Sequence, residues 1–148
     1  MWLTTFFEQI HVERCNNFNT AIVDGEFPAS AAYINVSDFN RFVFLVRAGT
    51  LNSALTCQVQ QATAIDSTAK DITGAVAVVG AGDDNEVFLI EVECRRLDIN
   101  NGYNFVTLDV TGAAGGDDYL DILFIGVNPA SVPVTQPTGT NTPVIVAG

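Results

Sequence analysis

The single histidine, His11, is the first residue to examine for chemistry, because histidine is the side chain that most readily changes charge near neutral pH. It stands between Ile10 and Val12. Catalysis or metal binding would need partner groups at a defined geometry, and no Ser-His-Asp order can be recognised around it. We therefore interpret His11 as a structural residue.

Carboxylates are the other abundant reactive groups, with 17 Asp and Glu against 6 Lys and Arg. Glu91 and Glu93 fall on one face of an expected strand, and a glycosidase needs two carboxyl groups ~5–10 Å apart across the sugar. A glycan cleft normally also presents several aromatic platforms, whereas the chain has one tryptophan, Trp2. The pattern favours a solvated sheet face over an acid–base pair.

Two Asp-rich stretches are the best candidates for a metal site, namely Asp83-Asp84-Asn85-Glu86 and Asp117-Asp118 with Asp121. Oxygen-rich loops can hold Ca²⁺, which takes several oxygen ligands. Neither stretch has the alternation of an EF-hand loop, and glycine beside paired aspartates is equally typical of an exposed turn. We expect turns here. We assign no catalytic residue, no cofactor and no metal to the chain, and we do not expect an enzyme.

The charge balance argues against several classes of partner. A formal net charge of -11 repels phosphate groups, so we expect no direct contact with nucleic acid or with an anionic membrane. No apolar run approaches the ~20 residues of a membrane-spanning helix, and the start MWLTTFFEQI has no basic region of a signal peptide. Three cysteines without a Cys-x-x-Cys motif predict neither a disulfide framework nor a zinc site. We expect synthesis in a reducing cytoplasm, with Cys57 and Cys94 buried.

Apolar and polar residues alternate with a period of two along much of the chain, which predicts half-buried β-strands. The alternating segments are Leu55–Gln61, Phe88–Cys94 and Val106–Thr111; Phe42–Val46 and Ile122–Val127 are apolar at both phases; Ala32–Val36 and Ala75–Val79 are further candidates. A strand that is apolar on both faces fits the centre of a sandwich, or a sheet whose outer face meets another subunit.

Turn sequences rich in Gly, Asn and Asp separate these segments, and the one at Ala48–Ser53 is predicted to join Phe42–Val46 to Leu55–Gln61 as a hairpin. Short strands at this spacing predict an all-β protein, an antiparallel β-sandwich. We divide the chain into an N-terminal segment (1–31) that packs on or extends from the domain, the sandwich (32–127) and an extended arm (128–148).

The Pro- and Thr-rich arm is the most unusual part of the sequence. It contains four of the five prolines, and no charged residue occurs from Ile122 to Gly148. Proline removes backbone donors and favours extension, whereas Val144-Ile145-Val146 again has high β-propensity. We predict a semi-rigid spacer that ends in a short strand offered to a partner, with a frayed tail as the alternative.

A resemblance to a known class of proteins begins at Tyr33–Gly49 (YINVSDFNRFVFLVRAG) and continues in Thr56–Thr63 (TCQVQQAT). The downstream pattern consists of Val92–Asp98, Gly102 and Val106–Thr111. Together these segments resemble small virion proteins of tailed bacteriophages. The resemblance covers roughly Tyr33 to Val127, and its motifs are mainly hydrophobic.

The resemblance implies a jelly-roll head decoration (cement) protein. Such a protein would be a homotrimer on the exterior of a phage capsid in the virion, made in the host cytoplasm, with the major capsid protein as its partner. It would stabilise the shell by bridging capsid subunits, and the resemblance carries no active site.

The residues expected at the interface lie at the two ends of the chain: Trp2, Phe6 and Phe7, and Val144, Ile145 and Val146. Aromatic side chains concentrate binding energy at interfaces, although the N-terminal aromatics can equally seal the base of the sandwich.

Two other functions stay open at this point. A carbohydrate- or receptor-binding module would display Tyr33, Tyr103 and Tyr119 on one outer face. Another minor virion protein, of the tail or of the head–tail connector, would share the sandwich.

Overall fold

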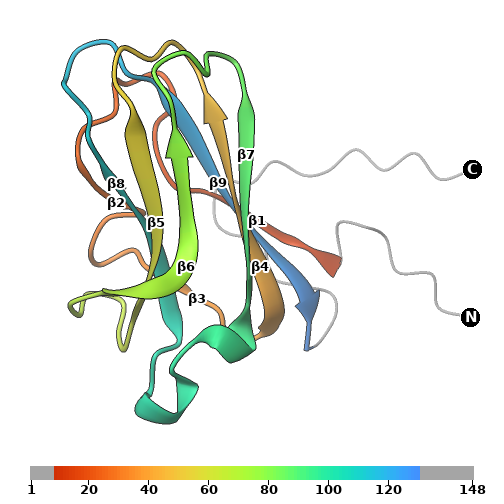
Figure 1. The fold of residues 1–148 in the computed structure, drawn as a ribbon. Coiled ribbons are helices and arrows are strands. Elements are labelled where there is room, and N and C mark those ends of the chain that lie inside the picture. The colour runs from red at the N-terminus through yellow and green to blue at the C-terminus, as the bar shows by residue number, and fades with distance from the viewer. Residues whose placement is uncertain (1–8, 131–148) are drawn as a thin grey trace, which may run out of the picture.

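The computed structural model describes residues 9–130, which form two antiparallel sheets packed face to face (Figure 1). Sheet A has the strand order β1-β9-β4-β7, with β1 at His11–Arg14, β4 at Phe39–Ala48, β7 at Val87–Glu93 and β9 at Leu120–Pro129. Sheet B has the order β2-β8-β5-β6, with β2 at Gly25–Phe27, β5 at Leu55–Ala62, β6 at Lys70–Val79 and β8 at Phe105–Thr111. The two-residue strand β3, Ile34–Asn35, also pairs with β8. The predicted antiparallel β-sandwich is confirmed.

Most strands that follow one another in the chain lie in different sheets. β1, β4, β7 and β9 belong to sheet A, and the strands between them belong to sheet B. This alternation gives the strand order of a jelly roll. Two 3₁₀ turns, Cys94–Arg96 and Ile99–Asn101, lie in the connection from β7 to β8.

The hairpin predicted through Ala48–Ser53 is wrong. β4 pairs with β7 and β9, and β5 pairs with β6 and β8, so this loop crosses from sheet A to sheet B. Leu51 is buried on the way. The turn sequence marks a change of direction, but it does not determine which strand the chain pairs with next.

The sandwich extends beyond the predicted range of residues 32–127. β1 and β2 come from the segment 1–31 and pair with β9 and β8, and β9 continues to Pro129. These first strands have four and three residues, too few to show a period of two in the sequence.

Three phenylalanines form the centre of the core. Phe42 and Phe44 of β4 and Phe124 of β9 are fully buried. The Phe42 and Phe124 rings stack with centroids 5.6 Å apart, and Phe44 meets Phe124 edge-on at 5.6 Å. Burying such a side chain stabilises the fold by about 1.5–3 kcal/mol, so this cluster holds the inner face of sheet A against sheet B.

The three cysteines are free and buried, as predicted for Cys57 and Cys94. Cys57 lies on the inner face of β5, whereas Cys94 begins the first 3₁₀ turn and is not part of the predicted strand. Burial raises the pKa of the Cys57 thiol to about 12 and that of Cys94 to about 11, and it also raises the pKa of Cys15.

We expect the native protein to resist thiol labelling. A pKa of about 11 in place of 9.0 lowers the thiolate fraction of Cys94 at pH 8 about a hundredfold. Ellman's reagent at pH 8 should therefore react slowly with the native chain, and with all three thiols once the chain is unfolded in guanidinium. Full-speed labelling of any thiol in the native state would contradict the packing described here.

Candidate functional site

The Asp-rich loops use their carboxylates to bind backbone N–H groups. Asp83 Oδ2 accepts a hydrogen bond from the N–H of Gly80 (2.7 Å), and Asp84 Oδ1 accepts one from the N–H of Leu51 (2.9 Å). Within residues 9–130, no three His, Cys, Asp or Glu side chains come together in a way that could hold a metal ion. These carboxylates therefore act as turn-stabilising groups.

Asp118 joins two loops at one end of the sandwich. Its side chain is buried, and Oδ1 accepts hydrogen bonds from the N–H groups of Asn52 (2.7 Å) and Ser53 (2.9 Å). Oδ2 accepts one from the N–H of Ala114 (3.3 Å). Burial alone would raise the pKa of Asp118, but the N–H donors outweigh it, and the pKa lies below its usual value.

Glu91 and Glu93 lie on the outer face of sheet A, joined by one arginine. Arg41 contacts Glu91 at 2.7 Å and Glu93 at 3.1 Å. The hydrogen bond and charge of Arg95, with a smaller contribution from Arg41, lower the pKa of Glu93. The acid of a glycosidase needs a raised pKa, so this pair is better described as an ion-pair network.

His11 packs among aromatic rings. Its ring centroid lies 5.6 Å from Phe39 and 6.0 Å from Phe124, and Nε2 lies 3.2 Å from Glu13 Oε2. These contacts agree with the structural interpretation of this residue.

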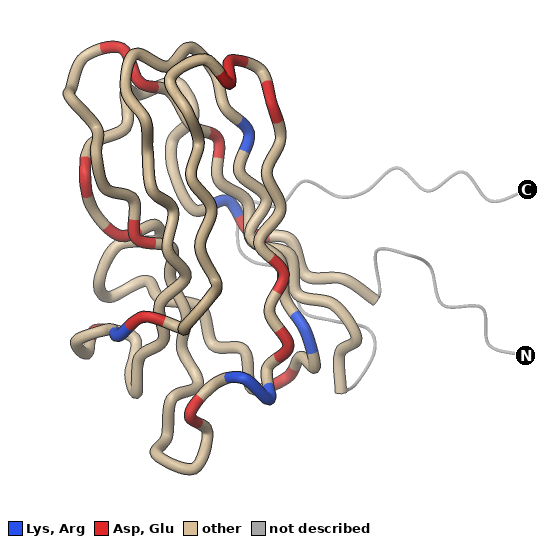
Figure 2. Tube along the Cα trace, in the orientation of Figure 1, with Lys and Arg blue, Asp and Glu red and all other residues tan. Residues whose placement is uncertain are grey.

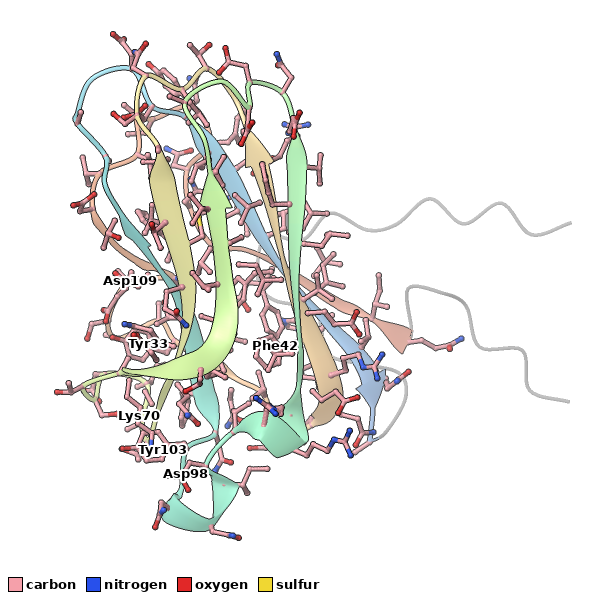
Figure 3. All side chains as sticks on the ribbon, viewed as in Figure 1. Tyr33, Phe42, Lys70, Asp98, Tyr103 and Asp109 are labelled. Atoms are coloured by element: carbon pink, nitrogen blue, oxygen red, sulfur yellow. The ribbon has the colours of Figure 1, made fainter. Side chains whose placement is uncertain are left out.

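The three tyrosines do not lie on one outer face. Tyr33 is buried and donates a hydrogen bond from its hydroxyl to Glu26 Oε2 (2.6 Å). Tyr103 lies under Lys70, whose Nζ is 3.8 Å from the ring centroid and 2.8 Å from Asp98 (Figure 3). Tyr103 precedes β8, whereas Tyr119 follows it at the opposite end of the sandwich, just before β9. The described residues therefore do not offer the tyrosine platform that a carbohydrate-binding face would need.

Sheet B has an acidic outer face. Glu26 of β2 lies directly across from Asp109 of β8, beside an open hollow of about 490 Å³ that Tyr33 also lines. Burial, and then the negative charges of Glu26, Asp71 and Asp24, raise the pKa of Asp109. Like charges are therefore concentrated on this side of the molecule.

Sheet A has an apolar outer face, which is the candidate interaction surface. Side chains alternate across a strand, so the residues between the core residues point outward. The outer apolar face consists of Val43 and Leu45 of β4, Val87 and Leu89 of β7, and Leu123, Ile125 and Val127 of β9. Leu89 is 65% exposed and Val87 is 55% exposed.

The pairing register makes this surface continuous. Leu45 lies directly opposite both Leu89 and Leu123, and Val43 lies opposite Ile125 in the next row. Residues opposite one another in neighbouring strands have Cβ atoms about 5 Å apart. The apolar side chains therefore form one patch across three strands, which is the usual mark of an interaction site.

The charged residues that the strands of sheet A place on this side are equal in number for each sign. Arg41, Arg47 and Arg14 occupy the same side of the sheet as Glu91, Glu93 and Asp121, so their formal charges cancel. Arg47 pairs with Asp121 at 3.2 Å. In Figure 2, basic and acidic segments lie near one another over sheet A, whereas the β2–β8 side of sheet B carries acidic segments. This face is neutral in a chain of net charge -11.

β7 gives the outer apolar face an open edge. It is the last strand of sheet A, and its second side has no strand partner among residues 9–130. The N–H of Ala48 donates to the carbonyl of Glu86 (2.9 Å), which fixes the phase of the β4–β7 ladder. Because hydrogen-bonding direction alternates along a strand, the backbone groups of Val87 and Leu89 point away from β4. Such an edge is usually covered in a working assembly.

Part of this surface was visible in the sequence. The segments Phe42–Val46 and Ile122–Val127 are apolar at both phases, and their strands supply five of the seven residues of the outer apolar face. The sequence pattern did not single out Leu89 as a surface residue, although it lies on the same face of the strand as Glu91 and Glu93. The predicted interface residues Trp2, Phe6, Phe7, Val144, Ile145 and Val146 lie outside the described residues.

Replacing Asp118 with Ala should lower the free energy of unfolding at pH 7 by about 2 kcal/mol, because three backbone N–H groups lose their acceptor. Because the pKa of Asp118 is lowered in the folded state, its contribution is present above the unfolded value of ~3.9 and is lost as pH falls through the folded value. Urea denaturation measures both effects. Its exposed neighbour Asp117, replaced with Ala, is the control, and an equal loss in both variants would refute the role assigned to the Asp118 hydrogen bonds.

The outer apolar face should be dispensable for folding. Leu89→Thr should change the free energy of unfolding by less than about 0.5 kcal/mol, because the side chain is largely exposed. Ile90→Thr, one residue along the same strand but buried, should cost about 2 kcal/mol or more. Denaturant titrations of both variants make the comparison. A large loss for Leu89→Thr would assign this residue to the core.

Comparison of the chain with protein-family models, with curated proteins and with solved structures gave no match. Residues 9–130 also contain no helix that is long and apolar enough to cross a membrane.

Proposed function

We propose that the chain is a structural virion protein that decorates the outside of a phage capsid and stabilises it by bridging major capsid protein subunits. In this proposal it works as a homotrimer. The outer apolar face of sheet A is the observation that carries the proposal, because it gives a small rigid domain a surface suited to protein contact.

The fold supports this role in two further ways. A jelly roll is a rigid platform, and loops at both of its ends can be shaped without disturbing the sheets. β9, one of the two middle strands of sheet A, ends at Pro129. In this proposal, the arm that follows in the sequence contacts a neighbouring subunit.

Decoration does not require a strong contact for each copy. A protein that binds a repeating lattice through several subunits gains effective concentration, and weak contacts then sum to tight attachment. Proline in the arm lowers the entropy that is lost when the arm is ordered on a partner. These effects explain how a small domain can stabilise a shell even when each of its contacts is weak.

Copy number in purified virions tests the proposal. Quantitative mass spectrometry should find the chain at a stoichiometry comparable to that of the major capsid protein, because decoration follows the lattice. A ring of about a dozen copies or fewer would instead indicate a connector or tail protein, and absence from virions would refute a virion role.

Deletion of residues 131–148 tests the arm separately. The truncated chain keeps β9 complete, so its free energy of unfolding should stay unchanged while its binding to expanded capsid shells weakens by about tenfold or more. Co-sedimentation with shells measures the binding. Unchanged affinity would show that the arm has no part in attachment.

A further inference from the structure

We propose that a second copy of this chain covers the outer apolar face of sheet A. This inference rests on the proposed function, in which the protein works as a homotrimer, and it places the outer apolar face of each copy against a neighbouring copy around the symmetry axis. Three properties of the described residues lead to it: the shape of the face, its charge and its open edge.

The shape of the face suits sheet-on-sheet packing. Leu45, Leu89 and Leu123 form one row across three strands, with Val43 and Ile125 in the next row. The inner face of the same sheet already packs in this way against sheet B. A face of branched aliphatic side chains on a regular sheet can pack against another sheet with interdigitating side chains, at a separation of about 10 Å.

The charge of this face makes it a better place for two copies to meet than the acidic face of sheet B. Two molecules that each carry a net charge of -11 repel one another, and the acidic face of sheet B, with Glu26, Asp71 and Asp109, would place like charges together. On the outer apolar face, the arginines and carboxylates cancel, and Arg41 and Arg47 already have partners. Within residues 9–130, this is the broad apolar surface on which two identical acidic chains can meet without bringing like charges together.

The open edge gives a second reason for coverage. Val87 and Leu89 combine exposed apolar side chains with backbone groups that no described strand pairs. Soluble proteins usually protect such an edge, because it invites uncontrolled sheet extension. Here Glu91 and Glu93 protect the second half of β7 only, and a second copy would shield the first half.

The test compares two single substitutions in the full-length chain. Leu89→Glu places a carboxylate in the outer apolar face, and Val78→Glu places one on β6, in sheet B, at a residue with nearly the same exposure, 63% against 65% for Leu89. Sedimentation velocity over a range of concentrations measures the oligomeric state, and circular dichroism checks that both variants fold.

We expect the wild type and Val78→Glu to form the same oligomer, and Leu89→Glu to dissociate, with its dissociation constant raised by about tenfold or more because a buried carboxylate lacks a partner. An oligomer that is unaffected by Leu89→Glu, or that dissociates equally in both variants, overturns the inference. A monomeric wild type overturns it as well.

Shell binding separates this inference from the proposed function. If the wild type is monomeric but binds expanded shells, and only Leu89→Glu loses that binding, the capsid protein covers the face; the second copy is then wrong and decoration stands. If the wild type forms the expected oligomer through Leu89 but binds no shell, the self-association stands and the decoration role fails.

Discussion

The ladder between β4 and β9 is the interaction on which the rest of the structure depends. It joins residues 39–48 to residues 120–129, and β7 and β1 add to its two sides. Its inner face carries Phe42, Phe44 and Phe124, which pack against sheet B. Its outer face carries the apolar residues proposed to contact another molecule. One pairing of strands distant in sequence therefore creates both the core and the candidate site.

This ladder raises a problem of register, because both of its faces are apolar. In a sheet with one polar face, a slip of one residue would expose the core residues and bury polar ones. Here a slip would bury apolar residues in their place, so the loss of stability is smaller. Specific contacts must select the register instead. The Phe39 ring lies over Gly126, where an added Cβ would come within 2.7 Å of it, and Arg47 pairs with Asp121 across the strands. A side chain at residue 126, or the loss of that glycine by slippage, would displace the ring.

The sequence predicts the strands of this fold better than it predicts their partners. Alternation located β5, β7 and β8 to within about one residue, and the apolar runs located the central strands, because these patterns reflect burial within one segment. The hairpin at Ala48–Ser53 failed because pairing depends on distant contacts such as the one that Asp118 makes with Asn52 and Ser53. No local pattern distinguishes that aspartate from its exposed neighbour Asp117. The same limit applies to Leu89, whose importance follows from its position opposite Leu45.

The distribution of charge then directs how such a molecule can assemble. A large negative charge keeps copies soluble and apart in solution, and this repulsion acts on every face that shares it. Where positive and negative side chains cancel over an apolar surface, the repulsion falls and apolar burial can dominate. The outer face of sheet A meets this condition, and the outer face of sheet B does not, because Glu26 and Asp109 lie side by side there with Asp71 nearby. Association is therefore specified by where the charge is balanced as much as by where the surface is apolar, and a single carboxylate added to that face changes both conditions at once.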